Sequence, residues 1–283
     1  MSGFSPDWLA LREPADHAAR NGDLAARVQA HFQSLDHMTV VDLGCGSGSN
    51  LRALAPGLPL RQTWRLVDWD PALLAAARET LRDWALGENG EAHDEGAALR
   101  LRHAGRDIDV RFEQADLAQN IAKVLDAKAD LVTATAFFDL VSADWIAVLC
   151  EEIARRGLPL YAILTYNGEE TWEPPHAADA MVLAAFHAHQ QGDKGFGPAA
   201  GPFAAAHLQR VLESHGYRVS AAQSPWRLGQ DQAELLHELV GGIAAAVAET
   251  GLVPPEQLKS WRMARAEGAT VSIGHTDVFA ARD

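Results

Sequence analysis

The sequence contains only two cysteines, Cys45 and Cys150, among its 283 residues. Two cysteines exclude a framework of disulfide bonds and a zinc site built from cysteine ligands. Apolar runs long enough to span a bilayer are also missing, and residues 1–7 lack the basic and apolar regions of a secretory signal. The sequence therefore predicts a soluble cytoplasmic protein that does not act on a membrane.

Basic residues are scarce as well, because 24 lysines and arginines stand against 38 aspartates and glutamates. The formal charge of −14 disfavours a surface for DNA or RNA, which needs clustered basic side chains against phosphates. Hydrophobic residues make up 48% of the chain, enough for the core of one large domain. We expect a small molecule rather than a nucleic acid as substrate. The sequence does not indicate an oligomeric state.

A glycine-rich turn is the most informative feature that is present. Residues 39–43 form a β-branched and apolar run that is typical of a buried strand. Gly44, Gly46 and Gly48 follow directly, and a helix can begin after them. Such a turn lets a ligand approach the backbone closely. The next apolar strand ends in Asp68, whose carboxylate can accept both hydroxyls of a ribose. The pattern predicts a nucleotide-binding cradle.

The chain resembles the class I S-adenosylmethionine (SAM)-dependent methyltransferases. The matching motifs are Val41-Asp42-Leu43-Gly44-Cys45-Gly46-Ser47-Gly48, Val67-Asp68 and Gln114-Ala115-Asp116-Leu117. The resemblance covers roughly residues 39–166, and more loosely 270–280, and identifies no individual member. It implies SAM as cofactor, S-adenosyl-L-homocysteine as product, and methyl transfer to a small molecule, at oxygen or nitrogen rather than carbon.

The resemblance also implies a set of cofactor-binding residues at the strand ends. Asp42 would position the methionine end of SAM, and Asp116 would accept a hydrogen bond from the adenine amino group. Either aspartate could instead cap a helix or hold a turn. Asp68 is preferred over Asp70 for the ribose because Asp68 terminates the strand, and Trp69 packs on the adenine or against the next helix. The cofactor set is Asp42, Gly44, Gly46, Gly48, Asp68, Trp69, Asp116 and Leu117.

Strand and helix signals alternate through the middle of the chain, which predicts a parallel sheet covered on both faces. The expected fold class is α/β, a Rossmann-like, seven-stranded, mostly parallel sheet with helices on both faces and helical cap insertions. In the family the last two strands form an antiparallel pair at the sheet edge. The expected strands are residues 39–43, 64–68, 109–114, 130–136, 159–165, 217–223 and 269–280. The expected helices of the core are residues 49–55, 71–85, 117–126, 142–156 and 201–215.

The chain is expected to form a single domain, residues 1–283. Its core comprises about 37–166, 201–224 and 269–283, and the cap segments are 1–36, 167–200 and 225–268. These segments could cover the carboxyl ends of the strands, where open α/β sheets bind ligands. Residues 86–108 are interpreted as a surface insertion that includes a hairpin with its turn at Ala104-Gly105.

Candidate catalytic and substrate-binding residues follow the fourth and fifth strands. Asp139 could be a general base, a contact for a substrate ammonium, or a helix cap. One of Phe137 and Phe138 is expected to line the substrate site, and Phe138 is chosen. The segment 167–200 is polar, aromatic and rich in glycine, as loops that hold a substrate often are. The candidates are Asp139 and His189 for catalysis, and Phe138, Tyr166, His176, His187 and Lys194 for substrate binding.

Other interpretations stay open. His187 and His189 are two residues apart, a poor spacing for metal ligands on a helix, so no metal site is predicted. Arg12, Asp16 and His17 either line the cofactor mouth or form a solvated face. A non-catalytic SAM-binding regulatory module is one alternative function. A nicotinamide-dependent oxidoreductase is another, although Ser49 replaces the third glycine of Gly-x-Gly-x-x-Gly.

Overall fold

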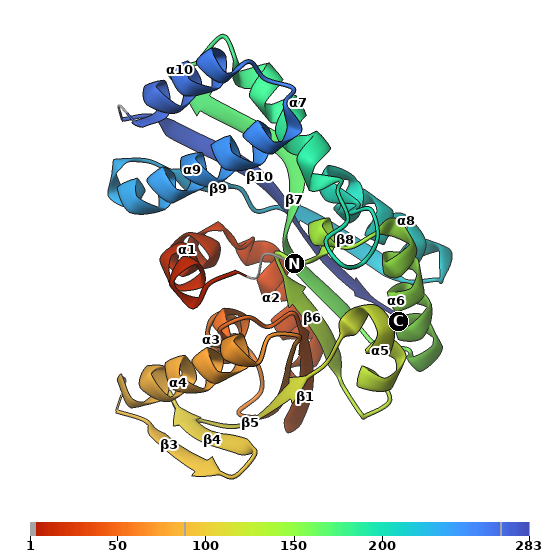
Figure 1. Ribbon diagram of the computed structural model, residues 1–283. Helices are drawn as coiled ribbons and strands as arrows, with labels where there is room; N and C mark the ends of the chain where they lie inside the picture. The colour runs from red at the N-terminus through yellow and green to blue at the C-terminus, as the bar shows by residue number, and fades with distance from the viewer. Residues whose placement is uncertain (1–3, 88, 267, 283) are drawn as a thin grey trace.

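The computed structural model describes residues 4–87, 89–266 and 268–282. In this part of the chain ten strands form one sheet, flanked by helices (Figure 1). The strands are β1 (His37–Leu43), β2 (Arg61–Asp68), β3 (Glu91–Glu95), β4 (Ala98–His103), β5 (Arg106–Gln114), β6 (Leu131–Thr135), β7 (Leu160–Glu173), β8 (Arg218–Gln223), β9 (Trp226–Leu228) and β10 (Thr270–Ala281). The helices are α1 (Pro6–Ala19), α2 (Gly22–Phe32), α3 (Ser49–Leu54), α4 (Pro71–Gly87), α5 (Leu117–Val124), α6 (Ala143–Arg156), α7 (Asp179–Gln190), α8 (Ala204–Ser214), α9 (Ala233–Thr250) and α10 (Pro255–Ala266).

The strand order is β3-β4-β5-β2-β1-β6-β7-β10-β8, and β9 pairs with β10. Strands β5, β2, β1, β6 and β7 are parallel, whereas β10 runs antiparallel to both β7 and β8. The predicted α/β fold class is therefore confirmed, with seven core strands and an antiparallel pair at the edge. Strands β3, β4 and β9 are additional to the seven.

Residues 86–108 are more closely joined to the sheet than the sequence suggests. The hairpin turn lies at Ala104-Gly105 as predicted, where both residues have positive φ (46° and 76°). However, its second arm is β5 itself, and β3 and β4 extend the main sheet beyond it. Leu99 and Leu101 of β4 are buried beneath α4, which explains why this insertion is part of the sheet.

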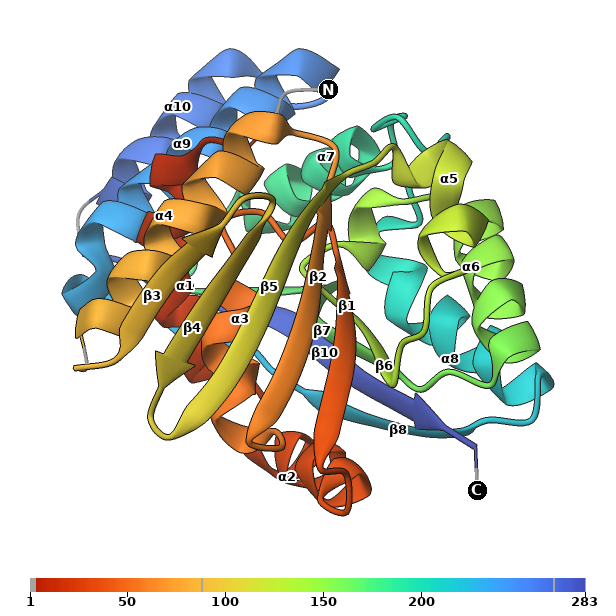
Figure 2. The same ribbon diagram turned by 90° about the horizontal axis from the view of Figure 1, so that it is seen from below.

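Two layers of helices cover the two faces of the parallel strands. A continuous apolar run is typical of a strand that is buried on both faces, so the sequences of these strands require such cover. Helices α5, α6 and α8 pack on one face and α2, α3 and α4 on the other (Figure 2). In α2 the apolar residues at helical spacing, Leu24, Val28 and Phe32, are buried, while Leu35 lies beyond the helix and is exposed. No helix in the described ranges combines the length and apolar composition needed to cross a bilayer.

Strands β7 and β10 form a long antiparallel ribbon that continues from the sheet into a cap of α7, α9, α10 and β9 (Figure 1). The sequence predicts that the fifth strand ends at residue 165, but β7 runs on to Glu173 because β10 pairs with it along this length. Residues 167–173 are thus strand rather than loop. The cap core includes Trp172, Trp226 and Trp261, which are buried.

Candidate functional site

The glycine turn between β1 and α3 has the predicted geometry. Gly44, Gly46 and Gly48 all have positive φ (63°, 53° and 78°), a region that side-chain-bearing residues avoid. A Cβ atom at Gly44 would lie 2.6 Å from a ring carbon of Phe137. Glycine is therefore required at residue 44 both for backbone conformation and for space.

Asp42 is buried beside this turn, with 1% of its surface exposed. Nδ2 of Asn50 donates a 2.8 Å hydrogen bond to Oδ1 of Asp42, whereas Oδ2 has no partner among the residues that the structure describes. Burial raises the pKa of Asp42 to about 7, although the Asn50 hydrogen bond and the Arg20 guanidinium oppose the shift. A carboxylate oxygen without a partner is costly to bury, so this one is suited to a cationic or hydrogen-bond-donating ligand.

Asp68 lies at the end of β2, and its carboxylate faces the same turn. Oδ2 accepts a 2.9 Å hydrogen bond from the backbone N–H of Gly46, and Oδ1 accepts one of 3.0 Å from Asp70. Burial raises the pKa of Asp68 above its ordinary value. Asp70 instead accepts a 2.8 Å bond from Ala72 N–H in the first turn of α4. The preference for Asp68 over Asp70 as the ribose ligand stays a prediction, and 55% of the surface of Trp69 beside them is exposed.

Asp116 and Leu117 occupy the start of α5. Oδ1 of Asp116 accepts a 2.9 Å bond from Ala118 N–H, and Oδ2 accepts a 3.0 Å bond from Nε2 of Gln119. The helix-cap alternative therefore describes the contacts of Asp116 in this structure, and its adenine contact stays a prediction. Leu117 is buried in the core, and its carbonyl accepts a 2.9 Å bond from the Trp145 indole.

Helix α1 covers the glycine turn. A Cβ atom at Gly46 would lie 3.0 Å from Cδ1 of Leu9. Nε2 of His17 lies 3.0 Å from Oγ of Ser49, and Nε of Arg52 donates a 2.7 Å bond to Glu13. The N-terminal segment thus contacts the cradle. This position is the one expected if its charged residues line the cofactor mouth.

A cavity of about 130 Å³ lies at the carboxyl end of β6 and beside the middle of β7, beneath the cap. It is lined by Phe4, Trp8, Arg12, Ala136, Asp139, Leu140, Leu164, Tyr166, Glu170, Phe186, Gln190, Trp226, Leu239, Ile243, Ile273 and His275. Ala136 and Leu164 have positive φ (50° and 53°), which is a strained conformation for non-glycine residues. Backbone strain of this kind is concentrated at ligand sites. We call this space the acceptor cavity.

Asp139 lies in a short 3₁₀ helix (Phe138–Leu140) directly after β6 and lines the acceptor cavity. It is 9% exposed, and its Oδ1 atom has no hydrogen-bond partner within the described ranges. Burial raises the pKa of Asp139 to about 6, against the opposing effects of backbone N–H groups and Arg12. Such a group can accept a proton near neutral pH.

A hydrogen-bonded row of side chains begins at the cavity wall, where Tyr166 and Glu170 line the cavity, and continues behind it. The Tyr166 hydroxyl donates a 3.1 Å bond to Glu170, and Nε2 of His187 lies 2.9 Å from the same hydroxyl. The indole of Trp172 donates a 3.3 Å bond to the other oxygen of Glu170. Burial raises the pKa of Glu170 and lowers that of His187. The structure thus brings together three polar groups, two of which the sequence predicts.

Other predicted residues lie elsewhere. Nε2 of His189 lies 3.1 Å from a carboxylate oxygen of Glu249 on α9, and His189 does not line the acceptor cavity. His176 lies between β7 and α7, with Nε2 3.3 Å from Oγ of Ser260. Lys194 lies in the half-buried loop after α7.

Phe138 is fully buried in the core on the α5–α6–α8 face, so it fills the core. Its neighbour Phe137 contacts the glycine turn and the Trp145 ring, with ring centroids 5.5 Å apart. The sequence expects one of these two rings in the core and the other at the site, and it assigns Phe138 to the site. The structure buries both rings in the same core cluster, and neither ring lines the acceptor cavity.

Several cavity residues are absent from the predicted site. Arg12 is identified as part of a charged cluster without an assigned role, whereas Glu170, Trp226 and His275 are not identified at all. His275 reaches the cavity because β10 pairs it with Tyr166 in register. Glu170 reaches the cavity because β7 continues beyond residue 165. The β-forming pair Thr171-Trp172 is a sequence signal for that continuation.

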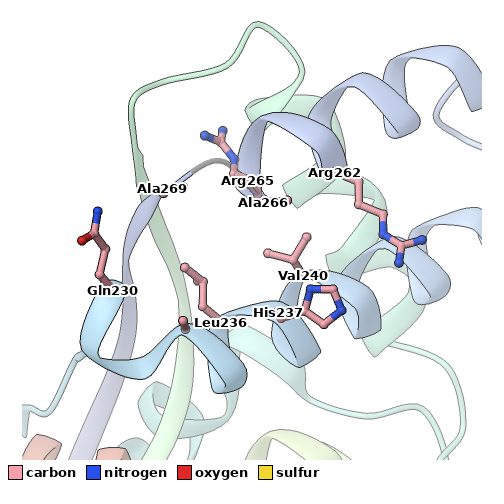
Figure 3. Close-up of a pocket in the computed structure, with 11 residues that line it drawn as sticks. Gln230, Leu236, His237, Val240, Arg262, Arg265, Ala266 and Ala269 are labelled. Carbon is pink, nitrogen blue, oxygen red and sulfur yellow. The ribbon is translucent and has the colours of Figure 1, made fainter.

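A second cavity, of about 290 Å³, lies within the cap between α9, α10 and the start of β10 (Figure 3). Leu236 and Val240 project into it from α9, and Arg262 and His237 lie together on one side. The guanidinium of Arg265 turns away from them and donates to the Pro174 carbonyl at 2.6 Å. None of the predicted cofactor or substrate residues lines this cavity. Within the described residues no group of three or more His, Cys, Asp or Glu side chains could hold a metal ion.

Comparison with known proteins shows the fold. No protein-family model matches the chain, and no curated protein matches it. Among solved structures, it is similar to a cyclopropane-fatty-acyl-phospholipid synthase-like protein from Lactobacillus casei (TM-score 0.58, 14% identity, 96% of this chain and 92% of that chain). It is also similar to a cyclopropane synthase from Mycobacterium tuberculosis (TM-score 0.51, 13% identity, 99% and 95%). The chain therefore has a known α/β fold over nearly its whole length.

Proposed function

We propose that the protein is a SAM-dependent methyltransferase that acts on a small molecule. The observation that carries this proposal is the glycine turn flanked by two buried carboxylates, with Oδ2 of Asp42 lacking a partner among the described residues. The residues fit SAM, because its methionine ammonium can supply the donor that Asp42 lacks and its ribose hydroxyls can reach Asp68 at the strand end. We call this group of residues the cofactor half of the site.

The residues of the cofactor half would hold SAM along the carboxyl edge of the sheet. The backbone of Gly44 to Gly48 allows close approach, Asp68 accepts from the ribose, and Asp116 accepts from the adenine amino group. The exposed indole of Trp69 offers an apolar face near the adenine. SAM supplies an electrophilic methyl carbon when it is bound.

Catalysis also requires that the acceptor is aligned with the methyl carbon and that water is excluded from the site. Helix α1 covers the glycine turn, and the acceptor cavity lies at the end of β6 and beside the middle of the neighbouring strand β7. Holding an acceptor against the methyl carbon can supply on the order of 7 kcal/mol of the barrier without a dedicated base. Asp139 can receive a proton where the acceptor must lose one.

The acceptor atom is proposed to be oxygen or nitrogen. The acceptor cavity is small and carries polar groups, which suits a compact polar acceptor. Carbon is the competing choice, because a cyclopropane synthase shares the fold. A non-catalytic SAM-binding module is disfavoured, since a protein that only binds SAM needs no strained, polar cavity beside the cofactor half.

Calorimetry with SAM, S-adenosyl-L-homocysteine and NAD(H) tests the proposal. We expect both sulfur compounds to bind and the nicotinamide cofactor not to bind. Tight binding of NAD(H) without a SAM signal would replace the proposed activity by a nicotinamide-dependent oxidation or reduction.

A further inference from the structure

Unpartnered acceptor atoms are concentrated in the acceptor cavity. Oδ1 of Asp139 and Oε1 of Gln190 are buried and have no hydrogen-bond partner in the described part of the chain, and both residues line the cavity. Burying acceptors without donors costs about 1–3 kcal/mol each. A ligand rich in N–H donors would offset that cost.

Aromatic side chains form much of the remaining wall, among them Trp8, Tyr166, Phe186 and Trp226. The faces of such rings attract cations. One example is already present, because the Arg12 guanidinium lies 4.9 Å from the centre of the Trp226 ring. The cavity walls are therefore suited to a cation with an apolar body.

The charges that face the cavity leave an acidic excess. Arg12 is paired with Asp16 through two hydrogen bonds of 2.9 and 3.1 Å, so its charge is compensated. Burial, and then the nearby Arg12, lower the pKa of His275 to about 3, so this imidazole is neutral at pH 7. The carboxyl groups of Asp139 and Glu170 remain, and Asp139 forms no ion pair with a described residue, although the charge of Arg12 acts on it from a distance.

We propose that the acceptor cavity binds a small protonated amine, whose ammonium group hydrogen-bonds to Asp139 and Gln190 and whose apolar body contacts the aromatic walls. This inference rests on the proposed methyltransferase function, in which the amine is the methyl acceptor. The volume of about 130 Å³ is slightly smaller than the roughly 150 Å³ of a cavity that holds one benzene molecule, so the apolar body can be no larger than a single ring. One ammonium proton passes to Oδ1 of Asp139 and then to water, which leaves the lone pair on nitrogen.

Three probes that differ in charge test the proposal by calorimetry on the unmodified protein: benzylamine, benzyl alcohol and benzoate. We expect benzylamine to bind at least tenfold more tightly than benzyl alcohol, and benzoate not to bind. The affinity for benzylamine should fall as the pH is lowered through about 6, where Asp139 becomes protonated. Equal affinities for benzylamine and benzyl alcohol would overturn the proposal.

Two variants locate the contact. Asp139→Asn should weaken benzylamine at least tenfold and leave benzyl alcohol unchanged, whereas Asp144→Asn, at an exposed position of α6, should change neither. Circular dichroism checks folding, and if Asp139→Asn does not fold, the probe series on the unmodified protein decides alone. Retained benzylamine affinity in a folded Asp139→Asn variant overturns the proposal. SAM binding without amine binding refutes the amine inference only, whereas absence of SAM binding refutes the proposed function.

Discussion

The cofactor half and the acceptor cavity are built in different ways. The cofactor half comes from short continuous stretches, since Asp42 and the three glycines lie within seven residues and Asp68 ends the adjacent strand. The acceptor cavity takes residues from α1, the segment after β6, β7, α7, β9, α9 and β10. A site built from one short stretch of sequence therefore keeps its chemistry. A site assembled from many elements can change its ligand through substitutions in any of those elements.

The largest expected effect is on the cofactor half. Gly44→Val should abolish SAM binding and lower the free energy of unfolding by about 2–4 kcal/mol, because the side chain requires a strained φ and collides with Phe137. Calorimetry and urea unfolding measure the two effects. Gly241→Ala in α9, where an added Cβ meets nothing within 4 Å, should raise the free energy of unfolding by about 0.5–1 kcal/mol. Normal SAM affinity in Gly44→Val would show that the turn is not the cradle.

A smaller effect is expected at the ribose contact. Asp68→Ala should weaken SAM binding more than tenfold, because a hydrogen bond to a charged acceptor contributes about 1.5–3 kcal/mol. Asp70→Ala should mainly cost stability, on the order of 1 kcal/mol, through the lost hydrogen bond in the first turn of α4. The opposite ranking of the two variants in SAM calorimetry would mean that Asp70 is the ribose ligand.

Both halves contain a carboxyl group with a raised pKa, so both should contribute to the pH dependence of stability. The folded protein holds protons on Asp42 up to a pH of about 7 and on Asp139 up to about 6, whereas the unfolded chain releases them near pH 4. The free energy of unfolding should therefore decrease as the pH rises from about 4 to 7. Urea unfolding should show Asp42→Asn to be more stable than the unmodified protein at pH 8, by on the order of 1–3 kcal/mol, and no different at pH 4. A rise in stability over that interval would contradict the assignment.

The smallest effect is expected at His189, which the sequence proposes as catalytic. Because its imidazole pairs with the exposed Glu249 outside the acceptor cavity, His189→Ala should change the affinities for SAM and benzylamine by less than twofold. Tyr166→Phe is the matched comparison within the cavity and should weaken benzylamine more. If His189→Ala had the larger effect, the predicted catalytic role of His189 would be favoured over the position seen here.

The cofactor half could be predicted from the sequence more fully than the acceptor cavity, because its residues lie close together in the chain. The strand–turn–helix around Asp42 and the position of Asp139 after β6 could be predicted, because each depends on residues adjacent in the chain. The assignment of His275 could not, since a histidine within a strand carries no signal of which partner strand it meets. The assignment of Phe138 to the site could not be decided from the sequence, since tertiary packing, which no single residue signals, buries both Phe137 and Phe138 in the core. The roles of Asp116, His176 and Lys194 stay predictions.

The β7–β10 ribbon also limits how chains of this kind can change over evolution. Each residue advances a strand by about 3.3 Å and alternates its side chain between the two faces. The ribbon already contains one irregularity, in which residues 167–169 of β7 lie opposite Gly274 alone, between the pairs Tyr166–His275 and Glu170–Ile273. A further insertion or deletion in the regular pairing from Glu170 to Glu173 would turn the side chains beyond it to the opposite face. The loop after α7 carries no such constraint. We therefore expect new acceptor preferences to arise by substitution at constant length in the ribbon, and insertions to accumulate elsewhere.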